Sequence, residues 1–198
     1  MTSVPAGTVL FRVHAARRGS SEFNPGLGGQ SRFAPLLAGA PPVVVPTLYA
    51  SSSIAGAFSE SIFHDVPYRG IAKRILISRL AEYVLSALVA QREIHVAQLA
   101  GAGLRRVGVR RRDLIDGGPL TYTSTVRWAA ALHDCPAQPG GLLWTSRQDD
   151  TAQALVLFGD RVAETRLLAI SGPIALGSPP GLDLVEQAAN AAGISVVR

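Results

Sequence analysis

The pattern of apolar and polar residues is clearest between residues 43 and 65, where it predicts a strand, a tight turn and a helix. Residues 43–50 hold an apolar β-branched run with one proline in it, which is typical of a short buried strand. Three serines, Ser51 to Ser53, follow. A serine hydroxyl can accept a hydrogen bond from a free N–H group of a first helical turn. We therefore expect a helix over about 53–63.

The predicted helix has two different faces. Ile54, Phe58 and Ile62 recur every four residues and form one apolar stripe that would pack on the core. The opposite face gathers small and polar residues: Ser53, Gly56, Ala57, Glu60 and His64. A carboxylate at Glu60 would then lie where a ligand can approach closely. The alternative, an ordinary solvent-exposed glutamate, is the more common situation for this residue type.

Further elements follow from the same periodicities. Alternation over 9–14 predicts an opening strand with Arg12 between apolar neighbours, whereas the many glycines and prolines of 15–46 predict a long irregular stretch. Other expected strands cover 142–146, 154–158, 167–170 and 194–197, the last pairing at a sheet edge, and other expected helices cover 121–133, with Trp128 available to the core, and 182–192.

Residues 70–99 give a mixed signal. Ile71, Ile75 and Leu76 suggest a helix, but 83–89 and 94–99 suit two strands. We favour a hairpin that turns near Gln91 and Arg92. Short antiparallel strands with scattered helices, and no regular alternation of strand and helix, predict an α+β fold with small, mostly antiparallel sheets and flanking helices.

Length and composition indicate one compact domain over residues 1–198. Hydrophobic residues make up 47% of the chain and charged residues 17%, which is a globular and not a disordered composition. No apolar run approaches the about 20 residues that cross a bilayer, and the N-terminus lacks the features of a secretory signal, so we expect a cytoplasmic protein without membrane contact. Cys135 is the single cysteine, which excludes an internal disulfide and a cysteine-based metal cluster.

The formal net charge of +5 comes almost wholly from arginine, since Lys73 is the only lysine. Such a charge favours an anionic partner: nucleic acid, a nucleotide diphosphate or an acidic protein. Residues 104–113 are the most basic segment, but they hold no aromatic residue. A solvated helix face or a protein-docking patch is therefore favoured over nucleic-acid binding. Arg12, projecting from a strand, would suit a diphosphate because its planar fork donates two parallel hydrogen bonds; a surface salt bridge is the alternative.

Several motifs in a fixed order carry a resemblance to a known family. They are Leu10-Phe11-Arg12-Val13, Gly29-Gln30-Ser31-Arg32-Phe33, Thr47-Leu48-Tyr49-Ala50 with Glu60 eleven residues after the tyrosine, and Trp144-Thr145-Ser146-Arg147 ahead of the strand at 154–158. With these motifs the chain resembles RES-domain proteins, a family named for an Arg, a Glu and a Ser. The resemblance implies an ADP-ribosyltransferase-like fold acting on NAD, and a toxin paired with an Xre-type helix-turn-helix antitoxin.

The resemblance also implies roles for individual residues. Arg12 and Arg32 would hold the diphosphate of NAD, and Tyr49 would stack on the nicotinamide or hydrogen-bond near it. Ser146 would hydrogen-bond Glu60 or the ribose, and His64 is a possible pocket residue without the partners of a metal site. One departure concerns the family's Arg-Trp-Asn motif, which reads Arg-Phe-Ala here. Asn24 is a candidate replacement for the missing asparagine.

The expected chemistry needs one well-placed carboxylate. The nicotinamide nitrogen of NAD is already cationic and leaves as a neutral group, so it needs little acid catalysis, while positive charge builds on the ribose. Glu60 could stabilise that charge. Three functions remain open: an NAD glycohydrolase or phosphorylase, an ADP-ribosyltransferase that modifies a protein target, and a basic binding module without catalysis.

Overall fold

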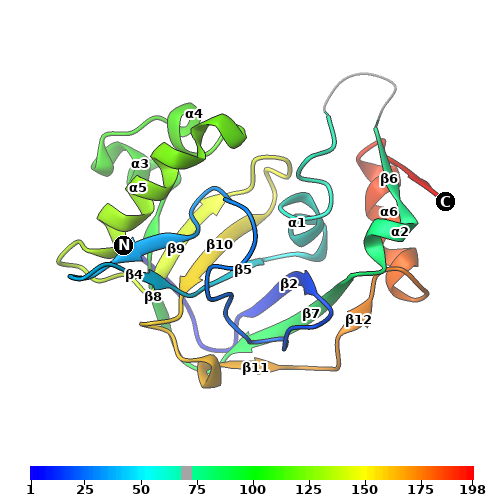
Figure 1. The fold of residues 1–198 in the computed structure, drawn as a ribbon, viewed down its shortest axis with the longest axis horizontal. Coiled ribbons are helices and arrows are strands. Elements are labelled where there is room, and N and C mark those ends of the chain that lie inside the picture. The colour runs from blue at the N-terminus through cyan, green and yellow to red at the C-terminus, as the bar shows by residue number, and fades with distance from the viewer. Residues whose placement is uncertain (68–72) are drawn as a thin grey trace.

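The computed structural model describes residues 1–67 and 73–198, and a large mixed β-sheet forms its centre (Figure 1). The strands in their spatial order are β1 (Thr2–Val4), β8 (Ile94–Gln98), β9 (Gly141–Thr145), β10 (Gln153–Phe158), β5 (Thr47–Ser51), β2 (Val9–Ala15), β7 (Tyr83–Ala90) and β11 (Leu167–Ala169), with β12 (Ile174–Ala175) also paired to β7. Neighbouring strands of this sheet are antiparallel except β8 and β9. The α+β class is confirmed, although this sheet is larger than the small sheets that we expected.

The parallel pair of β8 and β9 depends on a long crossover that contains most of the helices at one end of the molecule. It carries α3 (Ala102–Val107), α4 (Arg111–Leu114), a 3₁₀ turn η1 (Pro119–Thr121) and α5 (Tyr122–His133), which gather together in Figure 1. A tight turn can join only antiparallel neighbours. Parallel strands need a longer crossover that brings the chain back to the end of the sheet where the first strand began. The helix expected over 121–133 is confirmed, but Trp128 is 37% exposed on α5 and not in the core.

The hairpin that we favoured over 83–99 is wrong, although both strands exist. β7 pairs with β2 over seven residues, from Val9 opposite Val89 to Ala15 opposite Tyr83, whereas β8 lies on the far side of the sheet between β1 and β9. Local alternation defines a strand but does not define its partner. Of the alternative helix, Ile75 and Leu76 lie in β6 (Arg74–Leu76), followed by a short α2 (Ile77–Leu80), and Ile71 falls outside the described residues.

The helix α1 (Ile54–Ser59) is shorter than the predicted one. The Ser53 side chain caps it by accepting a hydrogen bond from the Gly56 N–H at 3.0 Å, and turns without helical continuity follow Glu60. Gly56 is required for close packing, because an added Cβ would lie 2.3 Å from the Ser51 hydroxyl and 2.5 Å from Ala152. The region before α1, expected as one strand, forms two strands, β4 (Val43–Val45) and β5. β4 pairs with β3 (Leu36–Ala38) in a small hairpin outside the large sheet. Val43 is 62% exposed, where we expected a buried strand.

The C-terminal part closes the other end of the molecule. Helix α6 (Gly181–Ala191) and β13 (Ser195–Val197) confirm the expected helix and closing strand, and β13 pairs in parallel with β6 as a separate two-stranded sheet. Phe58 of α1 and Val185 of α6 belong to one apolar cluster, so α1 is fixed between the large sheet and α6. Within the described ranges, no helix is long and apolar enough to span a membrane.

Candidate active site

Glu60 and Ser146 meet where α1 ends. The Ser146 hydroxyl donates a hydrogen bond to Glu60 Oε1 at 2.6 Å, and the Arg147 backbone N–H donates to the same oxygen at 3.0 Å. Ser146 is fully buried, while Glu60 is half-buried. Glu60 Oε2 accepts no hydrogen bond from residues 1–67 or 73–198. The carboxylate is thus fixed through one oxygen, and the other is left for a ligand.

Sheet register brings these two residues together across 86 positions of sequence. Helix α1 follows β5 directly, the Ser146 loop follows β9, and β10 lies between β5 and β9. On β10, Ala154 is opposite Ser51 on one side and Trp144 on the other. The strands β5 and β9 therefore end beside the same end of β10. The segments that follow them, α1 and the Ser146 loop, come together there.

Arg111 of α4 holds the backbone of the Ser146 loop. Its guanidinium donates to the carbonyl oxygens of Thr145 at 3.2 Å and Ser146 at 3.0 Å, and it forms an ion pair with Asp116 at 3.0 Å. Because a guanidinium presents its donors in a rigid plane, two carbonyl contacts fix the end of β9 more firmly than a single bond would. This arginine belongs to the basic segment 104–113 and acts inside the fold, so that segment is not a uniformly free cationic surface.

A cleft of about 500 Å³ opens in front of the Glu60 carboxylate. Its lining residues are Gln30, Ser31, Arg32, Tyr49, Glu60, Ser61, His64, Asp65, Pro119, Tyr122 and Trp144. Four of the predicted site residues, from three separate parts of the sequence, therefore share this cleft. The volume lies within the range of roughly 300–1,000 Å³ that is usual for small-molecule sites.

Arg32 lies deep in the cleft wall and is only 4% exposed. Its Nη1 donates to the Gly117 carbonyl at 2.9 Å, its own carbonyl accepts a hydrogen bond from the Thr125 hydroxyl, and its guanidinium lies 5.7 Å from the centre of the Tyr122 ring. Burial lowers the pKa of Arg32. Its Nη2 is buried and has no hydrogen-bond partner among the described residues. An unpaired donor on a buried cation is costly, and a turn of the side chain toward the cleft would let an anionic or carbonyl group of a ligand satisfy it.

Tyr49 stands between the cleft and the core. Its hydroxyl accepts a hydrogen bond from the Phe33 N–H at 3.1 Å and lies 3.0 Å from the Ser31 hydroxyl, while its ring meets Trp144 edge to face at 6.3 Å. Burial raises the pKa of Tyr49 to about 12, so the phenol stays neutral at ordinary pH. With its hydroxyl fixed in the wall, Tyr49 can offer the ring to a ligand.

Comparison with known protein families matches residues 9–176 to the RES domain. The chain belongs to the RES-domain family. RES domains are associated with NAD-linked toxin activity in toxin–antitoxin systems. A search among curated proteins found no match. The matched range includes all the residues of the cleft, and α6, which packs against α1, lies beyond it.

Within the RES domain, Arg12 lies on β2 as expected, beside the main cleft and not in its lining. It does not line the cleft of about 500 Å³ but two neighbouring cavities, a small one that includes Glu60 and one of about 310 Å³ that includes Asn24. Its side chain is buried and donates to the Ser20 carbonyl at 2.8 Å, and burial lowers its pKa to about 10. The contacts that hold Arg12 are thus backbone carbonyls and not a surface salt bridge.

Asn24 also lies outside the main cleft. Its side chain accepts hydrogen bonds from the N–H groups of Gly26 and Leu27 and contacts Arg18, which orders the loop before the RES-domain motif around Arg32. In place of the family's tryptophan, Phe33 is fully buried and meets Trp144 edge to face at 5.0 Å. Phe33 therefore belongs to the core, while Asn24 does not bring an amide into the cleft.

Three contributors to the site were not identified from the sequence. The ring of Tyr122 faces the Arg32 guanidinium, and its hydroxyl is 3.0 Å from His64 Nε2. The Thr125 hydroxyl donates a hydrogen bond to the Arg32 carbonyl. Arg111 holds the Ser146 loop. The first two begin the predicted helix 121–133, where an aromatic and a threonine three residues apart share one face. That spacing could have indicated that Tyr122 and Thr125 act together, whereas no sequence pattern indicated that Arg111 contacts the Ser146 loop.

Proposed function

We propose that this RES-domain protein cleaves the nicotinamide–ribose bond of NAD as the toxin of a toxin–antitoxin pair, and that it acts in the cytoplasm. The observation that carries the proposal is the fixed Glu60 carboxylate, which lines a cleft of suitable size and whose Oε2 accepts no hydrogen bond from the described residues. A carboxylate in that state can stabilise positive charge that develops on the ribose more than it stabilises the neutral sugar of the substrate.

The cleft also suits the rest of the nicotinamide half of the substrate. Arg32 lines the cleft with a guanidinium whose charge would attract a phosphate group, and Tyr49 presents a ring against which a nicotinamide can stack. A hydrolase that must protonate a poor leaving group needs a second carboxylic acid beside the first. Asp65 is the other acid in the lining, and it lies next to His64 at 3.0 Å from its Nδ1. Nicotinamide needs no such acid, which agrees with a site built around Glu60.

The acceptor that attacks the ribose distinguishes the two enzymatic alternatives. Water or phosphate would make the protein a glycohydrolase or phosphorylase that depletes NAD, and a protein side chain would make it an ADP-ribosyltransferase. We favour the first because it requires no acceptor beyond water or phosphate, and both fit in the cleft beside Glu60. A protein without either activity would be a binding module.

The test is to incubate purified protein with NAD in the presence and absence of phosphate and of a cell extract. Free nicotinamide with ADP-ribose, or with ADP-ribose 1-phosphate when phosphate is present, is the expected result. Label transferred from NAD to extract proteins, with no turnover in their absence, would instead favour the transferase. Absence of nicotinamide release in every condition would refute the proposed function.

A further inference from the structure

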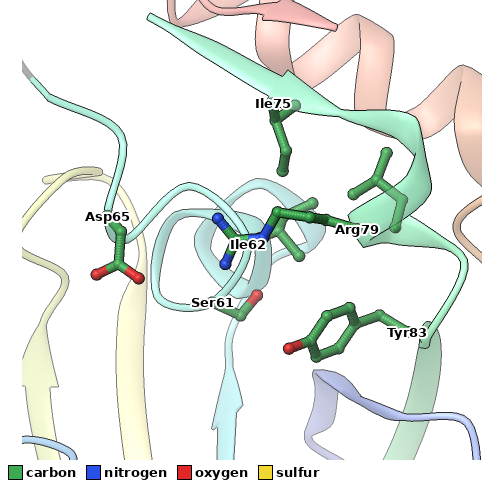
Figure 2. A pocket seen from close by; sticks show the side chains of 7 residues that line it. Ser61, Ile62, Asp65, Ile75, Arg79 and Tyr83 are labelled. Atoms are coloured by element: carbon green, nitrogen blue, oxygen red, sulfur yellow. The ribbon is translucent and has the colours of Figure 1, made fainter. Parts of the chain in front are cut away.

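A second pocket of about 160 Å³ adjoins the cleft (Figure 2). Ser61 and Asp65 line both spaces, so a ligand that reaches Glu60 can continue into the second pocket. The remaining lining residues are Ile62, Ile75, Arg79, Leu80 and Tyr83. Figure 2 shows the Arg79 side chain reaching across the pocket above Ile62, and the hydroxyl end of Tyr83 pointing toward Ser61.

The walls of this pocket suit a flat heteroaromatic ring. Ile75 and Leu80 are buried and Ile62 is half-buried, which gives an aliphatic floor. The Arg79 side chain is exposed, and it makes no hydrogen bond or ion pair with the described part of the chain. A planar guanidinium that is not engaged elsewhere can stack on a nucleobase whose other face rests on aliphatic carbon.

The polar rim of the pocket suits the hydroxyl and amino groups of a nucleoside. The Asp65 carboxylate stands at the junction with the cleft with its side chain 72% exposed, so solvent screens its charge, and it can accept hydrogen bonds from ribose hydroxyls or from an exocyclic amino group. Ser61 and Tyr83 add hydroxyl groups that can donate or accept. Both halves of NAD carry a flat ring and hydroxyl donors, but the nicotinamide ring is cationic and would be repelled by the Arg79 guanidinium, whereas the adenine of adenosine is neutral and can stack on it.

We propose that this pocket binds the adenosine end of NAD, an inference that rests on the proposed function. Ser61, which follows Glu60 in the chain, links the two spaces, so nicotinamide ribose at Glu60 and adenosine at Arg79 would occupy neighbouring sites in one continuous groove. The subsite therefore acts in substrate binding and makes no contact with the bond that breaks.

The cavity beside Arg12 is the competing location for the adenosine, and two of its three arginines, Arg12 and Arg18, are already engaged, while Arg17 is exposed. Arg12 donates to the Ser20 carbonyl, and Arg18 pairs with Glu22 at 3.0 Å and contacts Asn24 at 3.2 Å. A base placed against Arg12 or Arg18 would have to displace these contacts, whereas Arg79 has none with residues 1–67 or 73–198 to lose.

The experiment compares NAD with nicotinamide mononucleotide, which has the same scissile bond but no adenosine. Nicotinamide release is measured for the wild type, for Arg79→Ala, and for Ile62→Phe, which fills the pocket from its floor. Arg74→Ala is the matched control, because Arg74 is an exposed arginine on the neighbouring β6 and does not line the pocket. Circular dichroism and thermal unfolding identify any variant that fails to fold.

For both pocket variants we expect KM for NAD to rise about tenfold, the size of one lost base-stacking contact, with kcat unchanged. The value of kcat/KM for nicotinamide mononucleotide should stay at the wild-type level, and Arg74→Ala should match the wild type on both substrates. Equal losses on the two substrates, or no change on NAD in a folded Arg79→Ala protein, would overturn the subsite.

Direct binding of AMP separates this proposal from the proposed function. Calorimetry should show AMP binding to the wild type and about tenfold weaker binding to Arg79→Ala. If the wild type cleaves neither substrate but shows this difference, the proposed catalysis fails while the subsite stands. A wild type that cleaves NAD but binds no AMP at millimolar concentration would refute the subsite and leave the catalytic proposal intact.

Discussion

The Ser146 hydroxyl donates a 2.6 Å hydrogen bond to Glu60 Oε1, and the Arg147 N–H adds a second bond to the same oxygen. Two donors on one oxygen hold the carboxylate plane and keep its charge directed at the cleft. Fixed charge is useful in catalysis because it needs no reorganisation when the transition state forms. The predictions below follow from this arrangement.

Glu60→Gln should lose NAD cleavage by about a hundred- to thousandfold in kcat, the usual effect of removing one well-placed electrostatic group. The amide keeps the shape of the side chain, so fold and most NAD affinity should remain. Nicotinamide release and calorimetry measure the two effects. Glu186→Gln, on an exposed position of α6, is the matched control and should behave as the wild type. Near-normal turnover by folded Glu60→Gln would remove Glu60 from the mechanism.

Ser146→Ala should reduce kcat by roughly ten- to a hundredfold with little change in KM, since a hydrogen bond to a charged group contributes about 1.5–3 kcal/mol. Glu60 keeps the Arg147 N–H bond, so the loss should be smaller than for Glu60→Gln. Ser124→Ala removes an exposed hydroxyl elsewhere and serves as the control. A loss in Ser146→Ala equal to that in Glu60→Gln would indicate that Ser146 does more than orient the carboxylate.

Arg32→Lys should weaken NAD binding by about tenfold, because an ammonium can replace the bond to the Gly117 carbonyl but not the second donor of the fork. Calorimetry in the Glu60→Gln background measures affinity without consuming the substrate. Arg12→Lys should weaken binding as well, and there a thermal unfolding measurement must accompany it, since Arg12 also holds the Ser20 carbonyl. Unchanged affinity in both variants would refute the diphosphate assignment. Arg127→Lys, on an exposed face of α5, is the control.

Sequence patterns predicted the local parts of this site well. The serine cap, α1 and the strand before Ser146 follow from short-range signals that act through neighbouring residues. The partners of strands do not follow from such signals, which is why the predicted hairpin over 83–99 was wrong and the parallel crossover from β8 to β9 was not expected.

The same limit applies to the residues that support the site. Arg111 and Ser146 are 35 positions apart and meet only because the crossover brings α4 over the end of β9. Arg12 shows the converse case: its place on β2 was predicted correctly, but its carbonyl partners come from the irregular stretch after the strand, whose course no periodicity describes. Motif order located the cleft residues, and long-range packing determined what each of them contacts.

His14 predicts a pH dependence of stability. It is buried with its Nε2 2.8 Å from the Ser86 hydroxyl, and burial, followed by the charge of Arg12, lowers its pKa from 6.5 to about 4. The unfolded chain therefore binds more protons between these values, so the contribution of His14 is complete above about pH 6.5 and is lost as pH falls toward 4. Urea unfolding at several pH values should show this slope in the wild type and in His95→Gln, an exposed control, and a reduced slope in His14→Gln. An unchanged slope in folded His14→Gln would refute the assignment.

We also propose that an Xre-type antitoxin restrains this RES-domain protein by covering the cleft beside Glu60 without changing the fold. Part of the basic segment is engaged within the protein, because Arg110 and Arg112 pair with Asp113 and Arg111 holds the Ser146 loop. Arg105 and Arg106 of α3 remain exposed, and they could attract an acidic partner toward the same end of the sheet.

Occlusion makes the two ligands competitive. Titration of the purified pair with NAD, with the toxin as Glu60→Gln to prevent turnover, should show that each ligand weakens the binding of the other by the same factor, as linkage requires. Arg105→Glu with Arg106→Glu should slow association with the antitoxin, most strongly at low salt, and leave NAD affinity unchanged, because electrostatic steering acts mainly on the association rate. Simultaneous binding of NAD and antitoxin with undiminished affinities would exclude occlusion. An unchanged association rate in the double variant would exclude the α3 arginines as the steering surface, while reciprocal weakening would still support the blocked cleft.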